Sequence, residues 1–88
     1  MSNSKYVTRF EPAAQADLRK IPKRQAIAIL RKLGDLETDP YGFGTTAMVS
    51  QPDRRRLRVG VYRLSYTVDN GELVVWVLKV GHRSTVYE

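Results

Sequence analysis

The stretch RRRLRVGVYRLSYTV occupies residues 54–68 and decides the fold. On either side of Gly60, apolar or aromatic side chains alternate with arginine, serine or threonine, which is the pattern of strands buried on one face only. Glycine tolerates the backbone of a tight connection. We therefore predict two half-buried strands joined by a two-residue turn at Gly60 and Val61.

The register of this hairpin separates two kinds of side chain. With the turn at Gly60 and Val61, the paired positions are Val59 with Tyr62, Arg58 with Arg63, Leu57 with Leu64 and Arg56 with Ser65. One face then carries Leu57, Val59, Tyr62, Leu64 and Tyr66, and the other carries Arg54, Arg56, Arg58 and Arg63. Like charges directly opposite each other cost about 0.2–1 kcal/mol, and a bound anion would relieve this repulsion.

Upstream of the hairpin, the sequence predicts one strand and two helices. Residues 6–10 are rich in aromatic and β-branched side chains and precede Pro12, which suits the first position of a helix ending before Pro22. The next helix has one apolar stripe, formed by Ala26, Ile29, Leu30, Leu33 and Leu36 at spacings of three and four. It ends at Asp39-Pro40, and residues 41–53 are expected to form a loop.

Downstream of the hairpin, Asp69-Asn70-Gly71 predicts a turn, because asparagine and glycine tolerate positive φ. Residues 73–78 are apolar at every position, as in a strand placed centrally in a sheet. Residues 85–87 are candidates for a short further strand. The expected fold is α+β with the order β-α-α-β-β-β, an antiparallel sheet with two helices packed on one face.

Composition excludes several classes of protein. With 88 residues the chain is long enough for one domain, taken as 1–88. The absence of cysteine removes disulfides and thiolate chemistry, and one histidine is too few for a histidine-based metal site, so we expect no metal and no cofactor. No apolar run is long enough to span a membrane, and the polar opening lacks the apolar core of a signal peptide. A cytoplasmic location is expected.

The charge of the chain indicates a polyanionic partner. The formal net charge is +6, and five arginines fall within residues 54–63. The planar guanidinium group grips phosphate in a bidentate way and stays charged near neutral pH. The alternative is a solvated face that keeps the protein soluble, or one that Asp53 or Glu72 neutralises.

The last residues add further groups of the same kind. Lys79, His82, Arg83 and Tyr87 follow the third strand of the predicted sheet. Single-stranded RNA is usually bound by cations that grip its backbone and by aromatic rings that stack on its bases. Tyr87 is a candidate for such a ring; alternatively, it completes the core.

Three segments together resemble the RelE/ParE superfamily of bacterial toxins: 57–64 (LRVGVYRL), 70–75 (NGELVV) and 80–83 (VGHR) followed by Val86-Tyr87. Residues 10–18 also resemble the first strand-to-helix junction of that superfamily. The resemblance, closest to the RelE branch, implies a toxin from a type II toxin-antitoxin pair that a cognate antitoxin holds inactive. The RelE branch cleaves mRNA in the ribosomal A site with basic residues on the sheet and a tyrosine near the C-terminus.

The resemblance also implies roles for particular residues. The two basic residues of the second strand fall on Arg54 and Arg56, the central arginine on Arg63, the late arginine on Arg83 and the tyrosine on Tyr87. In the best-known relative the first two are lysines, the interval from late arginine to tyrosine is longer and a further helix can follow.

The implied catalytic set is Arg56, Arg63, Arg83 and Tyr87, and the implied RNA-binding set is Arg54, Arg58, Lys79 and His82. Arginine is a poor base, so charge stabilisation is what the arginines supply. His82 is a candidate proton carrier, or in the alternative a structural histidine.

Two further functions remain open from the sequence. A ParE-type inhibitor of DNA gyrase shares the fold and needs no catalytic group. An inactive relative that only binds RNA is the other. The oligomeric state of the toxin is not predicted, and the expected partners are an acidic antitoxin, the ribosome and mRNA, with no membrane.

Overall fold

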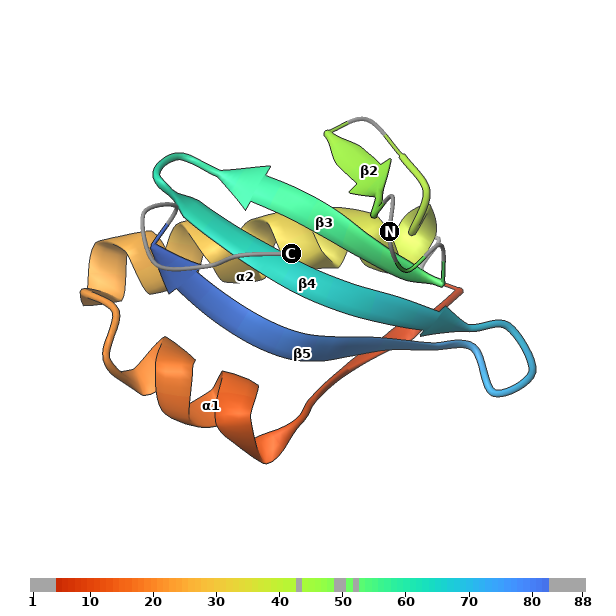
Figure 1. The fold of residues 1–88 in the computed structure, drawn as a ribbon, viewed down its shortest axis with the longest axis horizontal. Coiled ribbons are helices and arrows are strands. Elements are labelled where there is room, and N and C mark those ends of the chain that lie inside the picture. Colours follow the sequence, from red (N-terminus) through yellow and green to blue (C-terminus); the bar gives the residue numbers. More distant parts are fainter. Residues whose placement is uncertain (1–4, 43, 49–50, 52, 83–88) are drawn as a thin grey trace.

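The computed structural model of the chain describes residues 5–42, 44–48, 51 and 53–82. Its elements follow the order β1 (Val7–Phe10), α1 (Pro12–Arg19), α2 (Lys23–Thr38), β2 (Thr45–Ala47), β3 (Arg54–Val59), β4 (Tyr62–Asp69) and β5 (Val74–His82). The strands form one sheet in the order β1-β5-β4-β3-β2 (Figure 1). Because α2 runs behind β3 and β4 in that view, the face toward the viewer is the one that neither described helix covers.

The hydrophobic core lies between the two helices and the sheet, which confirms the expected α+β fold. A single cluster joins Ala14 of α1 and Ile29, Leu33 and Leu36 of α2 to the strands. The strand residues in that cluster are Leu57, Leu64, Tyr66, Val75, Val77 and Val80. Leu30 differs from the expectation, because 47% of its surface is exposed. It lies about 100° around the helix from Ile29 and so leaves the buried stripe.

The β3–β4 hairpin has the predicted register. Val59 pairs with Tyr62, Arg58 with Arg63, Leu57 with Leu64 and Arg56 with Ser65. Gly60 has a φ of 59°, a positive value that glycine adopts without strain at the start of a two-residue hairpin turn. Local turn chemistry and the alternation of side chains are therefore sufficient to set this pairing.

The sheet is mixed and not wholly antiparallel, which corrects the sequence expectation. β1 pairs with β5 in parallel, with Arg9 opposite Trp76, while the other pairs are antiparallel. No hairpin joins β1 to β5, so their relative direction follows from how the helices return the chain to the sheet. Within the expected loop of residues 41–53, β2 adds an edge strand to β3.

The last described strand is longer than predicted. β5 continues through Lys79 and Gly81 to His82, although the strand was expected to end at residue 78. Ser65 pairs with Lys79 and Tyr66 with Val77, so Leu78 is an extra residue in a β-bulge. The candidate fourth piece at 85–87 lies outside the described residues.

Two carboxylates tie the helices to the sheet. The Asp17 side chain of α1 accepts a hydrogen bond from the backbone N–H of Val80 at 3.2 Å, two residues beyond the bulge. Glu37 of α2 accepts one from the N–H of Thr8 at 2.9 Å. Its backbone carbonyl also accepts bonds from Lys5 and Tyr6. The Glu37 contacts satisfy N–H groups in and just before β1, an edge strand, and the Asp17 contact satisfies an N–H group of β5 beyond its pairing with β1.

Candidate functional site

The helix-free face of the sheet carries the basic residues, and we call it the open face. Side chains of directly paired strand residues lie on the same face, so the register arranges them in three rows. Arg58 lies opposite Arg63, and Arg56, Ser65 and Lys79 form the second row. The third row contains Arg54, Thr67, Trp76 and Arg9. Four arginines of the hairpin therefore share one face, as their alternation predicts.

Three of these arginines surround a hollow in the open face. Its volume is about 170 Å³, and it is lined by Gly44, Thr46, Arg56, Leu57, Arg58 and Arg63. The pairing of Thr46 with Arg56 shows that β2 supplies one wall. On this measure about 10–15 Å³ holds one water molecule, so the hollow has room for a group much larger than water, such as a phosphate. The hollow is suited to an anion.

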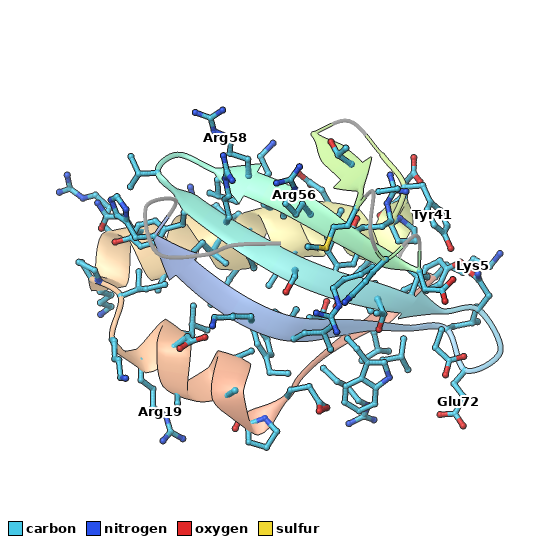
Figure 2. All side chains as sticks on the ribbon, in the orientation of Figure 1. Lys5, Arg19, Tyr41, Arg56, Arg58 and Glu72 are labelled. Atoms are coloured by element: carbon cyan, nitrogen blue, oxygen red, sulfur yellow. The ribbon has the colours of Figure 1, made fainter. Side chains whose placement is uncertain are left out.

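Three described acidic residues near the hairpin, Asp53, Asp69 and Glu72, make their contacts elsewhere. Glu72 sits in the β4–β5 turn, at a distance from Arg56 and Arg58 of β3 (Figure 2). The Asp69 carboxylate accepts bonds from the N–H groups of Gly71 and Glu72, both at 2.9 Å. Asp53 lines a different pocket with Arg55. The proposed neutralisation of the arginine face by Asp53 or Glu72 therefore lacks support from their positions.

Arg55 belongs to the opposite face. It pairs with the buried Tyr66, and its guanidinium carbon lies 5.1 Å from the centre of the Tyr41 ring. One of its terminal nitrogens donates a hydrogen bond to the Thr45 hydroxyl at 2.9 Å. Its contacts hold the loop after α2 against the sheet. Of the five arginines within residues 54–63, four therefore lie on the open face, and Arg55 makes structural contacts on the opposite face.

Tyr66, the strand partner of Arg55, also holds the chain that follows α2. Its hydroxyl donates a hydrogen bond of 2.6 Å to the buried carbonyl of Pro40. Burial raises the pKa of Tyr66 above its ordinary value of 10.0, because ionisation would leave a charge in the core. The ring is neutral at physiological pH and holds the end of α2 in place.

His82 lies on the side of the sheet that faces the helices. It pairs with Tyr62, and the two rings meet edge to face with centroids 5.8 Å apart and an interplanar angle of 77°. Tyr62 packs against the core cluster. The structure therefore brings Lys79 together with the arginines but places His82 across the sheet from them. This geometry favours the structural reading of His82 over the roles of proton carrier and RNA ligand.

Arg83 and Tyr87, the other two sequence candidates, lie outside the described residues. Within the described ranges no three His, Asp or Glu side chains gather in a way that would hold a metal ion. No helix in that part of the chain has the length and apolar character needed to cross a bilayer. The described site therefore consists of guanidinium and ammonium groups, which stabilise negative charge but do not accept protons near neutral pH.

Sequence reasoning missed Thr46, Arg9 and Trp76. The run of apolar residues at 73–78 conceals which of its members face the helices, and the bulge at Leu78 shifts the alternation after it. Arg9 alternates with Thr8 and Phe10, but its face is known only once β1 is paired with β5. Thr46 lies in a segment expected to be irregular. For these three residues, the only signal in the sequence was the alternation within β1, which sets Arg9 on the face opposite to Thr8 and Phe10.

Comparisons with known proteins give a consistent group of relatives. The family model described as the ParE toxin of the type II toxin-antitoxin system parDE matches residues 8–87. Toxin RelG of Mycobacterium tuberculosis is 36% identical over 89 residues, covering 93% of this chain and 95% of RelG.

Solved structures resemble the fold closely. The toxin-antitoxin complex RelBE2 from Mycobacterium tuberculosis contains a chain with a TM-score of 0.79 and 32% identity, covering 89% of this chain and 98% of that one. A chain of the intact E. coli RelBE toxin-antitoxin complex has a TM-score of 0.78 and 25% identity, covering 88% and 95% of the two chains.

Proposed function

Since this chain belongs to the ParE toxin family of type II toxin-antitoxin systems, within the RelE/ParE superfamily, we propose that it acts as a ribosome-dependent endoribonuclease that cuts mRNA in the A site. The observation that carries this proposal is the hollow lined by Arg56, Arg58 and Arg63, on a sheet face that neither α1 nor α2 covers. A gyrase ligand has no need of a phosphate-sized cationic hollow, whereas RNA cleavage does.

The proposed reaction is an internal transesterification. The 2′-oxygen of one ribose attacks the adjacent phosphorus, and the bond from phosphorus to the 5′-oxygen of the next nucleotide breaks. The 2′-hydroxyl proton passes to a base, and an acid protonates the departing 5′-oxygen. The products are a 2′,3′-cyclic phosphate and a free 5′-hydroxyl. Negative charge accumulates on the phosphorane, where fixed guanidinium groups lower its energy.

We assign phosphate binding to Arg56 and Arg63, which approach the hollow from neighbouring strands. Arg54, Arg58 and Lys79 extend the positive surface along the RNA backbone. Arg83 is proposed to act beside the leaving oxygen, and Tyr87 to stack on a base or to transfer a proton. These two assignments come from the superfamily resemblance alone.

A cognate antitoxin is the proposed protein partner, since the chain resembles toxins solved in the RelBE2 and RelBE complexes. The +6 charge of the toxin favours an acidic partner segment that associates quickly and blocks the open face. Expression together with the neighbouring gene is expected to yield a co-purifying small acidic protein. A stable, non-toxic protein recovered without any partner would count against this proposal.

Inhibition of DNA gyrase without catalysis is the second candidate, because the matching family model describes a ParE toxin. Two assays separate the candidates. Primer extension on translating ribosomes reveals codon-linked cuts if the chain is a ribonuclease, and a supercoiling assay reveals inhibition if it is a gyrase ligand. Growth arrest on induction, absent from an inactive RNA-binding relative, separates both from the third possibility.

Substitution of an arginine that lines the hollow tests the assignment of phosphate binding. We expect Arg63→Ala to lower cleavage on ribosomes by about 10²–10³-fold, the usual effect of removing one electrostatic contact to a transition state. Arg31→Ala is the matched control, because Arg31 is exposed on α2, away from the open face. Equal loss in both variants, or none in either, would contradict the assignment. Circular dichroism checks that both proteins remain folded.

A further inference from the structure

We propose that Trp76, between Arg9 and Thr67 on the open face, is a stacking platform for an unpaired base of single-stranded RNA. The proposal adds a second subsite to the arginine hollow and rests on the proposed function in one respect, that RNA lies along this face. Its ligand is a nucleobase of single-stranded RNA, with its flanking phosphates held by Arg9 and Arg54.

The pairing of four strands produces this subsite. Arg9 of β1 lies opposite Trp76 of β5, Trp76 opposite Thr67 of β4, and Thr67 opposite Arg54 of β3. All four side chains lie on one face, since partners across a ladder share a face. One aromatic ring therefore lies in a row with a guanidinium group toward each end.

Burial along β5 distinguishes Trp76 from its neighbours. Val75 and Val77, on either side of it, are fully buried and belong to the core beneath the helices. Trp76 is only partly buried and is not a member of the core cluster. Val7, 55% exposed, lies at the same side of β1 as Arg9. The indole thus contributes an apolar surface to a face that is otherwise mainly cationic.

The subsite lies within reach of an RNA strand bound at the hollow. Thr67 and Arg63 are four residues apart on β4, and a strand rises by about 3.3 Å per residue, so the rows are about 13 Å apart. The Arg56 row lies between them. An RNA strand following the direction of β4 meets cations in each row and an indole in the last. Aromatic rings on uncovered sheets bind unpaired bases in this way in other RNA-binding folds.

The chain offers a direct measurement, because Trp76 is its only tryptophan. The probe is a hexanucleotide of 2′-O-methyl uridine and adenosine, which lacks the attacking hydroxyl. We expect it to quench the tryptophan fluorescence of the isolated protein in a saturable way. An abasic oligomer with the same number of phosphates serves as the control and is expected to bind without quenching. Equal quenching by both oligomers would overturn the stacking proposal.

Variants give an independent readout by anisotropy of a labelled hexanucleotide. Trp76→Ala is expected to weaken binding by about tenfold, in line with the loss of one base stack, whereas Trp76→Phe retains most of the affinity. Leu30→Ala is the matched control, since Leu30 is an exposed apolar residue on α2. Unchanged affinity in Trp76→Ala would overturn the proposal. Loss in Trp76→Ala with rescue in Trp76→Phe supports it.

The outcomes keep this proposal separate from the ribonuclease proposal. Quenching by the base-containing oligomer alone, with no cuts in ribosomal primer extension, supports the subsite and counts against the nuclease. Cuts that depend on Arg63, with no quenching by either oligomer, overturn the subsite and leave the nuclease standing. A fluorescence change that only an acidic protein partner produces also overturns it, since Trp76 would then belong to a protein interface.

Discussion

Arg58 and Arg63 face each other across β3 and β4, at the positions where like charges repel most directly. An isolated fold gains nothing from this arrangement. A bound phosphate, however, receives two guanidinium groups that the strand pairing already holds in place. The pair is therefore expected to cost stability in the free protein and to contribute to anion binding.

The repulsion between Arg58 and Arg63 leads to a prediction about the stability of the free protein. Arg58→Gln and Arg63→Gln are each expected to raise the free energy of unfolding by about 0.2–1 kcal/mol, because each removes the same repulsion. The double variant is expected to gain little more than either single variant. Urea denaturation of all four proteins in a double-mutant cycle measures the coupling. Strictly additive effects would show that the two charges do not interact.

Tyr66 provides a prediction about pH. The pKa of Tyr66 is raised in the folded protein, so as pH rises above about 10 the unfolded chain loses the hydroxyl proton before the folded protein does. This ionisation favours the unfolded chain, and the free energy of unfolding falls. The contribution is complete below that pH and is lost as pH rises through the pKa of the folded protein.

We expect Tyr66→Phe to weaken this alkaline fall in stability. At neutral pH the variant loses the hydrogen bond to Pro40, which costs about 0.5–1.5 kcal/mol. Chemical denaturation of both proteins between pH 7 and 11 measures the difference, in which the other tyrosines cancel. Parallel curves across that range would contradict the assignment.

At the scale of elements, the β3–β4 hairpin holds the arginines in register, and its turn depends on Gly60. The positive φ of Gly60 strains any residue with a side chain, although nothing within 4 Å would contact an added Cβ. The cost of a substitution there is therefore conformational and not steric.

Gly34 supplies the matched comparison for Gly60. An added Cβ meets nothing within 4 Å at either position, but Gly34 lies within α2. We expect Gly60→Ala to lower the free energy of unfolding by about 1–2 kcal/mol and Gly34→Ala to raise it by about 0.5–1 kcal/mol. Thermal or urea unfolding measures both. Effects of the same sign would show that the turn conformation does not govern hairpin stability.

At the scale of the whole molecule, basic residues of neighbouring strands gather on the open face. Asp17 and Glu37 are used in contacts between the helices and the sheet, and Asp69 is used in the β4–β5 turn. The open face carries arginine and lysine across three neighbouring strands. Such a surface attracts a polyanion over long range and binds it through the release of counterions.

The salt dependence of RNA binding follows from this distribution. A plot of log affinity against log salt concentration has a slope of about −0.7 per phosphate contacted in a single strand. Arg63→Gln is expected to make that slope shallower by about 0.7, whereas Arg31→Gln on α2 leaves it unchanged. Fluorescence anisotropy between 50 and 200 mM salt, in the same range for each variant, measures the slopes. A slope insensitive to Arg63 would remove that residue from the phosphate contacts.

The sequence by itself determined the features that neighbouring residues encode. Alternation around Gly60 specified the hairpin, its register and the common face of Arg54, Arg56, Arg58 and Arg63, because side chains on a strand alternate and a two-residue turn sets the pairing. The spacing in α2 likewise predicted most of its buried stripe.

Only the tertiary structure decided the pairings between distant segments. The parallel contact of β1 with β5, the added strand β2 and the bulge at Leu78 depend on how the helices pack and how the sheet twists. These pairings bring Trp76 and Arg9 to the open face and take His82 away from it. The physical reason is that local periodicity fixes a side chain's direction relative to its own strand, whereas the partner of that strand is chosen by packing across the whole molecule.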